Sequence, residues 1–260
     1  MKIVTLVKQT FDTEAKIVIN GGKIDDTGVN LIMNPYDEFA VEEAIRIIEK
    51  QGGEVVALSA SANPKAQDAL RHALAMGADR AMLVNDTALA GSDEHAIATV
   101  LAKAIGTLEY DLILAGRISI DNQANQVVGR VAEILGLPVV TSVIKLEFNG
   151  NTATCTREVD GGVEIVEVTL PAIITAQKGI NEPRYPSLPN IMKAKKKELK
   201  TVTLADIGVD ASQVGPAGSF LEVLDITQPP ARAAGKVLSG EAADVAKQLV
   251  DLLKNEAKVI

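Results

Sequence analysis

The sequence predicts an α/β fold in which a parallel sheet is covered by helices on both faces. Short apolar runs rich in β-branched residues alternate with amphipathic helical patterns through the first half of the chain. Strands that alternate with helices form βαβ units, and these units build parallel sheets. The chain has 260 residues, 47% of them hydrophobic and 23% charged, which suits a large globular domain with an arm. After Pro138 the pattern changes to strands alone.

The elements of the first half follow from periodicity and from turn residues. Residues 37–51 place Phe39, Val41 and Ile48 on one helical face, and Gly77 stands where a glycine ends the next helix. Asn20-Gly21-Gly22 predicts a hairpin turn within residues 15–24. Buried strands are expected at residues 2–7, 54–59, 81–84 and 111–115, and helices at 37–51, 64–76, 93–105 and 122–135.

The second half predicts an antiparallel meander followed by a less regular region. Alternating residues at 142–148, 152–158 and 163–170 are joined by Asn149-Gly150 and Asp160-Gly161-Gly162, both hairpin turns. Residues 171–175 form one more buried strand, residues 179–200 a proline-rich and then basic structured loop, residues 201–240 an extended arm, and residues 241–253 a helix. We therefore expect a nucleotide-binding α/β domain over 1–200 and a C-terminal arm with a helix over 201–260.

The composition excludes several classes of protein. The net charge of −8 argues against binding to the phosphate backbone of a nucleic acid, which needs a basic face. The single cysteine, Cys155, permits no internal disulfide, and His72 and His95 lack partners at metal-site spacing, so all three are assigned to structure. No apolar run reaches the ~20 residues of a membrane span. The N-terminal residues resemble neither a signal peptide nor a transit peptide, so we expect no membrane insertion and a bacterial or archaeal cytoplasmic location.

One polar loop points to nucleotide binding. No nucleophile–base motif and no glycine-rich phosphate motif is present, which argues against a catalytic hydrolase or transferase. Residues 116–130 follow the strand at 111–115 and gather five uncharged hydrogen-bonding side chains and an arginine where a helix begins. Such a position, at the carboxyl end of a parallel strand, suits a phosphate or a nucleotide. Asp121 is expected either to cap this helix or to accept a hydrogen bond from a ribose hydroxyl.

A second loop, residues 34–38, has a structural explanation. Asn34 suits the helix N-cap, Pro35 the first helical position, and Asp37 and Glu38 the first turn. The two carboxylates would repel a phosphate, so any contact with a nucleotide is expected at its adenosine end.

A third segment combines apolar residues with lysines. Residues 185–192 are stiffened by Pro183, Pro186 and Pro189, and residues 193–197 form a basic run on an acidic protein. A stiff, exposed apolar loop loses little ordering entropy on binding, so it is a plausible docking anchor. A solvated charged face is the alternative interpretation of the lysines.

Several long motifs in the same order make the chain resemble the β subunit of electron transfer flavoprotein. The motifs lie at residues 157–166, 171–175 and 181–197, with shorter matches at 34–37 and 75–80. Cys155 is a small departure, because a small or branched residue is usual two positions before Arg157. The resemblance covers nearly the whole chain.

The resemblance implies a Rossmann-like fold of the adenine nucleotide alpha hydrolase-like type and a heterodimer with an α subunit. It implies an electron carrier without catalytic residues of its own, which passes electrons from flavoprotein dehydrogenases, such as the acyl-CoA dehydrogenases of fatty acid β-oxidation. FAD is then held mainly by the α subunit, and a structural AMP lies in this subunit. Residues 181–197 become the loop that dehydrogenases recognise, with Leu188 as its anchor. The implied AMP contacts are Leu6, Asn34, Pro35, Tyr36, Asp37, Ala60, Ser119, Ile120, Asp121, Asn122, Gln123, Ala124, Asn125, Gln126, Val127, Val128, Gly129 and Arg130.

Three alternatives remain at this point. Electron-bifurcating members hold a second FAD in place of AMP. Residues 91–93 and 116–117 favour that type, whereas the intact loop at 181–197 favours AMP, which we expect. A stand-alone adenine-nucleotide-binding regulatory domain would not need the arm at 201–240. An ATP-consuming adenylating enzyme would need a Ser-Gly-Gly loop after the first strand, where this chain has Lys8-Gln9-Thr10-Phe11.

Overall fold

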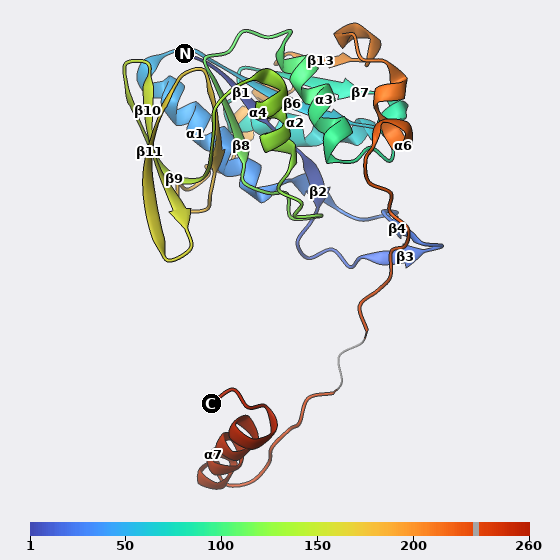
Figure 1. The fold of residues 1–260 in the computed structure, drawn as a ribbon, viewed down its shortest axis with the longest axis vertical. Helices are drawn as coiled ribbons and strands as arrows, with labels where there is room; N and C mark the ends of the chain where they lie inside the picture. The colour runs from blue at the N-terminus through green and yellow to red at the C-terminus, as the bar shows by residue number, and fades with distance from the viewer. Residues whose placement is uncertain (231–233) are drawn as a thin grey trace. The chain divides into compact units, whose positions relative to one another are not determined.

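A mixed sheet forms the centre of the molecule's larger unit (Figure 1). The computed structural model describes residues 1–230 and 234–260, and over these residues the main sheet has nine strands. Their order is β11-β10-β9-β12-β8-β1-β6-β7-β13. The bounds are β1 (Lys2–Leu6), β6 (Glu54–Ser61), β7 (Arg80–Asn85), β8 (Leu112–Gly116), β9 (Val139–Asn149), β10 (Thr152–Val159), β11 (Gly162–Thr169), β12 (Ala172–Ala176) and β13 (Leu199–Val202).

The strand pairings confirm a predominantly parallel sheet with a meander at one edge. Neighbouring strands from β9 through β12 to β13 pair in parallel, whereas β9, β10 and β11 pair antiparallel. The connection between β1 and β6 leads to one side of β1, while β8 pairs on its other side. The strand order therefore reverses at β1, which makes this point of the sheet a topological switch point.

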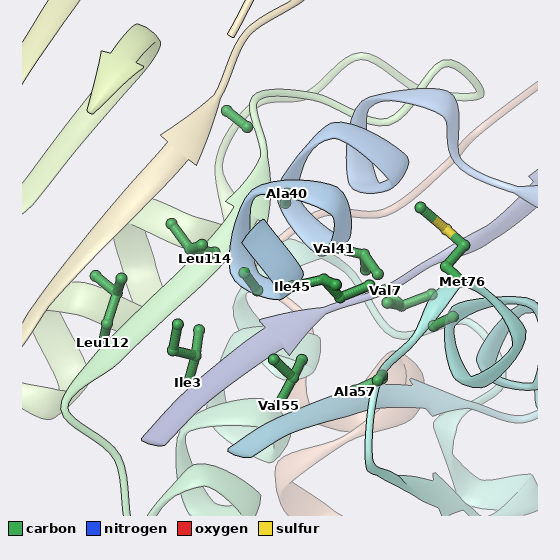
Figure 2. Close-up of a cluster of buried hydrophobic side chains, with 14 of the residues drawn as sticks. Ile3, Val7, Ala40, Val41, Ile45, Val55, Ala57, Met76, Leu112 and Leu114 are labelled. Carbon is green, nitrogen blue, oxygen red and sulfur yellow. The ribbon is translucent and has the colours of Figure 1, made fainter. Parts of the chain in front are cut away.

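Helices cover both faces of the sheet, because successive residues of a strand point to opposite sides. Ile3 belongs to a core formed with α1 (Pro35–Gln51) and α2 (Gln67–Met76), and Val4 to a core formed with α3 (Glu94–Ile105) and α4 (Val127–Leu135). Figure 2 shows side chains of the first core, with Val41 and Ile45 of α1 above the strands. Short 3₁₀ turns, η1 (Pro64–Ala66) and η2 (Thr87–Leu89), precede α2 and α3.

In the sequence, four short strands between β1 and α1 form two small sheets. β2 (Gln9–Phe11) pairs antiparallel with β5 (Leu31–Met33), and β3 (Val18–Asn20) pairs with β4 (Lys23–Asp25). Gly21 and Gly22, at φ 58° and 74°, adopt the left-handed region that the predicted hairpin turn requires. The hairpin prediction is confirmed.

Two sequence-based predictions of secondary structure were wrong. The helix expected over 122–135 begins only at Val127, because Gln123 and Asn125 adopt left-handed conformations, with φ of 53° and 52°, that a right-handed helix cannot include. The loop expected over 179–200 contains a short helix, α5 (Leu188–Ala194), and the edge strand β13. Pro189 was read as a loop residue, but it stands in the first turn of α5, where proline is well tolerated.

The first part of the expected arm packs onto the sheet. Leu204, Ile207, Val209 and Val214 are buried in the core beside α3 and α4. Their spacing follows neither the period of a strand nor that of a helix, so the sequence pattern did not reveal them. They are held by the short helical turns η3 (Ala205–Ile207), η4 (Ala211–Gln213) and α6 (Gly215–Gly218).

The described residues divide into two units. The larger unit comprises Met1–Val18 and Asp25–Leu224, and the smaller comprises Ile19–Ile24 and Asp225–Ile260. The smaller unit contains α7 (Ala242–Asp251), continued by one π-helical turn, η5 (Leu252–Glu256). Residues 231–233 of the expected arm lie outside the described residues. The division into a domain over 1–200 and an α-subunit-wrapping arm over 201–260 stays a prediction.

Candidate functional site

A cavity of about 430 Å³ opens at the carboxyl ends of β8, β1 and β6. These three strands are neighbours in the parallel sheet, so Ala115, Leu6 and Ala60 at their ends meet along one edge. This is the switch point of the sheet, where open α/β folds bind ligands. The volume lies within the range of small-molecule sites.

Asp37 lies in the floor of this cavity as a buried carboxylate with three donors. Its Oδ2 accepts from the backbone N–H of Lys8 at 2.7 Å, and its Oδ1 accepts from Asn34 Nδ2 at 2.9 Å and from the Gly116 N–H at 3.2 Å. Burial raises the pKa of Asp37 to about 7, although the three donors favour the charged form. Asp37 therefore joins the ends of β1 and β8 to the start of α1.

Asn34 holds the polar loop against α1. It occupies the N-cap position as predicted, but its side chain makes no capping bond. Instead its Nδ2 donates to the Ile118 carbonyl at 2.9 Å, and its Oδ1 accepts from the Ile120 N–H at 3.2 Å. The two candidate loops found in the sequence are thus joined by one side chain.

An ion pair lies at the rim of the cavity. Lys8 Nζ is 2.7 Å from Asp121 Oδ2 and donates to Ser119 Oγ at 3.3 Å. Burial alone would raise the pKa of Asp121, but the Lys8 ammonium outweighs this effect and holds the pKa below its ordinary value. α4 begins at Val127 with Gln126 as its N-cap residue, so Asp121 does not cap it. Of the two expected roles of Asp121, the cap was wrong and the contact with a ribose hydroxyl stays a prediction.

The first turn of α4 faces the cavity without a side-chain cap. Gln126 is the N-cap residue, but its Oε1 accepts from Arg130 Nη2 at 2.7 Å instead of from the helix backbone. Val127 and Val128 line the cavity at this turn. The leading N–H groups of a helix are positively polarised and need acceptors, so this turn is suited to an anionic or polar ligand group.

The opposite rim is formed by residues 91–93 and is covered by the chain itself. Asp93 caps α3 through the Ala96 N–H at 2.9 Å and accepts from the N–H groups of Phe220 and Leu221 at 2.8 and 3.2 Å. The ring of Phe220 stacks on His95 with the centroids 4.2 Å apart. The carboxylate oxygens of Asp93 thus already accept hydrogen bonds from the protein backbone, which leaves them little capacity to bind a ligand.

The structure brings most of the predicted contact residues to one cavity. Those that line it are Leu6, Asn34, Asp37, Ala60, Ser119, Asn122, Ala124, Asn125, Gln126, Val127 and Val128. The remaining predicted residues, which lie next to the cavity in sequence but outside its lining, are Pro35, Tyr36, Ile120, Asp121, Gln123, Gly129 and Arg130. Whether any of these residues binds a nucleotide stays a prediction.

Two cationic residues, Lys8 and Arg117, also line the cavity. Lys8 was not among the predicted contacts, whereas Arg117 belongs to the predicted polar loop and to the pair 116–117 that favours the bifurcating type. The Nε atom of Arg117 is buried and has no hydrogen-bond partner among the described residues, so it is a donor suited to a ligand acceptor. Arg117 directly follows β8, and Lys8 lies two residues beyond the end of β1. Their position at the carboxyl ends of β1 and β8 was a usable signal.

The predicted docking segment, residues 181–197, exposes large apolar side chains to solvent. Leu188 is 79% exposed and Tyr185 is 98% exposed, and Met192 lies on the same helix as Leu188. Leu188 therefore does not pack in this protein's own core. An exposed apolar cluster of this kind is suited to a binding partner.

The surroundings of Cys155 agree with its assignment to structure. Cys155 is a buried free cysteine, and burial raises the pKa of its thiol to about 11. Across residues 1–230 and 234–260, no group of His, Cys, Asp and Glu side chains is arranged to hold a metal ion. In the same part of the chain, no helix is both long and apolar enough to cross a bilayer.

Comparison with known proteins gives similarity over the full length. The family model described as the electron transfer flavoprotein domain matches residues 21–207. Proteins named electron transfer flavoprotein subunit beta from Bacillus subtilis (strain 168) and Syntrophomonas wolfei are each 48% identical to this chain, covering 100% of it and 100% and 98% of the relatives. A protein of the same name from Bradyrhizobium diazoefficiens is 42% identical, with 100% of both chains covered.

Proposed function

The chain belongs to the electron transfer flavoprotein family as a β subunit, and we propose that it passes electrons from flavoprotein dehydrogenases to a downstream acceptor within an αβ heterodimer. The relatives are named as subunits, and this chain matches them over almost their whole length. The alternative of a stand-alone regulatory domain therefore loses its support. In this proposal the chain is an electron-carrier subunit without catalytic residues, in the cytoplasm.

The cavity at β8, β1 and β6 is the observation that carries the cofactor assignment. It combines an uncapped α4 N-terminus, the unpaired donor of Arg117 and the side chain of Asn125 around a space of about 430 Å³. These groups fit a phosphorylated nucleotide, because they supply hydrogen-bond donors and positive charge at one end. We assign the cavity to AMP, with the phosphate toward α4 and Arg117 and the adenosine toward Asn34 and Asp37.

We favour AMP over a second FAD for two reasons. Ser92 and Asp93, which in the sequence favour the bifurcating type, are already bonded to the backbone of residues 215–221 and so offer a second FAD few free groups. The loop at 181–197 is intact and exposed, as expected for a subunit that docks to dehydrogenases. An electron-bifurcating subunit with FAD in this cavity is the second candidate.

The redox chemistry is supplied by FAD held mainly by the α subunit. The residues of this chain then bind AMP, contribute a surface to the flavin-holding partner and dock the electron donor. The docking surface is the segment 181–197 with Leu188 as its anchor, and acyl-CoA dehydrogenases of fatty acid oxidation are the proposed donors.

Expressing the chain with and without its α subunit tests this function. The chain alone should purify without yellow colour and with a low melting temperature, and the co-expressed heterodimer should be yellow. A stable chain that holds one flavin by itself would contradict the AMP assignment and favour the bifurcating type.

A further inference from the structure

The docking segment is attached to the rest of the protein at both ends by charged side chains. Between these attachments, Tyr185, Leu188 and Met192 are 98%, 79% and 62% exposed. Ala194 is the buried apolar residue of α5 and belongs to the same core as α2. The charged attachments therefore add to the restraints from the prolines, the Ser187 cap of α5 and the buried Ala194 in ordering the segment.

The first attachment, which we call the α1 clamp, centres on Glu42. This carboxylate is only 2% exposed, and it lies 2.6 Å from Arg46 Nε and 2.8 Å from Arg184 Nε. Burial alone would raise the pKa of Glu42, but Arg184 and Arg46 outweigh it and hold the pKa below its ordinary value. The guanidinium of Arg184 also spans Glu49, with N–O distances of 2.6 and 3.0 Å.

The α1 clamp reaches the backbone as well. The Arg184 N–H donates to Glu42 at 3.2 Å, and Arg46 Nη2 donates to the Glu182 carbonyl at 2.9 Å. Asn181 Nδ2 donates to the Phe39 carbonyl at 3.0 Å and to Glu43 at 2.9 Å. Three positions at the start of the segment are thereby fixed to one helix.

The second attachment, which we call the α2 clamp, fixes the far end of the segment. Arg71 Nη1 donates to the Ala194 and Lys197 carbonyls at 2.8 and 2.9 Å. Lys197 Nζ reaches back to the Leu74 and Ala78 carbonyls at 3.1 and 2.6 Å. Arg71 and Lys197 therefore bond the end of α5 and the turn after it to α2 and the residues that follow α2. Together with the α1 clamp, they hold the exposed helix at both ends.

We propose that Arg184 and Arg71 are positioning residues, which hold residues 185–193 preformed so that a partner dehydrogenase docks without having to order them. This inference rests on the proposed function, because it takes the segment to be the docking surface. Ordering one residue's backbone costs about 1–2 kcal/mol, so a clamp variant in which the equivalent of one residue must be ordered on binding would dock about five- to thirtyfold more weakly.

Arg184→Met and Arg71→Met test the proposal in the purified αβ heterodimer. Arg184→Met leaves Glu42 paired with Arg46, so no buried charge is abandoned. Arg80→Met is the matched control, because Arg80 pairs with Glu54 at 2.6 Å and is 33% exposed, against 34% for Arg184, but lies outside both clamps. Hydrogen exchange should accelerate at residues 185–193 in both clamp variants and not in the control.

Electron transfer from an acyl-CoA dehydrogenase supplies the second readout. In the clamp variants the KM for the dehydrogenase should rise about five- to thirtyfold with little change in kcat. Electron transfer to a small artificial acceptor, which needs no docking site, is the reference and should not change. Exchange and KM values equal to those of Arg80→Met would overturn the proposal.

Leu188→Ala separates the two levels of the argument. If it slows transfer while the clamp variants do not, the docking function stands and the clamp inference is wrong. If Leu188→Ala also leaves transfer unchanged, the segment is not the docking surface, and the inference fails with that part of the proposed function.

Discussion

Asn125 and Gln123 share a left-handed backbone conformation in one loop, but only Asn125 lines the cavity. Glycine adopts this conformation without strain, so Asn125→Gly removes the side chain and little else. A lost hydrogen bond is worth about 0.5–1.5 kcal/mol, and AMP should bind about two- to twelvefold more weakly. The measurement is calorimetric titration of the heterodimer after its nucleotide has been removed. Gln123→Gly is the control, and equal weakening in both variants would contradict a contact from Asn125.

Asp37 gives the protein a predicted pH dependence. Its pKa is about 7 in the folded chain and about 4 in the unfolded chain, so between these values the folded state keeps a proton that the unfolded state has lost. The contribution of Asp37 to stability is therefore complete below pH 4, falls as the pH rises to 7, and is constant above. The total change is at most about 4 kcal/mol.

Melting temperatures of the heterodimer and of its Asp37→Asn variant, measured from pH 4 to pH 8, test this dependence. The difference, wild type minus variant, should decrease as the pH rises and level off above pH 7. A difference that stays constant over this range would show that Asp37 keeps one protonation state.

At the scale of elements, β8 approaches α1 too closely for any side chain at Gly116. A Cβ atom there would lie 2.3 Å from Asp37 Oδ1 and 2.6 Å from the Tyr36 carbonyl carbon. Gly116→Ala must therefore shift the start of α1, and overpacking of this kind costs about 1–3 kcal/mol. Chemical denaturation should detect the loss. Gly162→Ala in β11 is the control, because no atom lies within 4 Å of its added Cβ, and equal losses in both variants would refute the close approach.

The elements that the sequence predicted well are those with a regular period. β1, β6, α1 and α3 are bounded by turn or capping residues and bury one face or both, so their apolar pattern alone located them. The start of α4 was missed because two non-glycine residues adopt φ values that no pattern marks. α5 was missed because three prolines suggested a loop, although one of them stands in a first helical turn.

The candidate site was predictable in part for the same physical reason. Its loops follow strands, and the carboxyl ends of parallel strands meet along one edge, so the contributions of β1, β6 and β8 followed from the topology. What no pattern showed was which polar groups satisfy one another. Lys8 pairs with Asp121, and Gln126 pairs with Arg130. These side chains therefore already have bonding partners within the protein.

At the scale of the molecule, the larger unit carries both of the surfaces to which the proposed function gives separate tasks. The cavity lies at the carboxyl edge of the sheet, and the docking segment is attached to α1 and α2 on one of its faces. Asp37 and Glu42 both belong to α1, so one helix contributes to the cavity floor and to the α1 clamp. The proposed function needs both surfaces, one for the bound nucleotide and one for the electron donor.

The nucleotide content of the purified αβ heterodimer tests the central claim most directly. The bound cofactors are released by denaturation, separated by chromatography and counted against the protein by mass spectrometry and absorbance. The account predicts one FAD and one AMP per heterodimer. Two FAD and no AMP would contradict the AMP assignment and identify the bifurcating type, and one FAD with no second adenine nucleotide would contradict the assignment of the cavity itself.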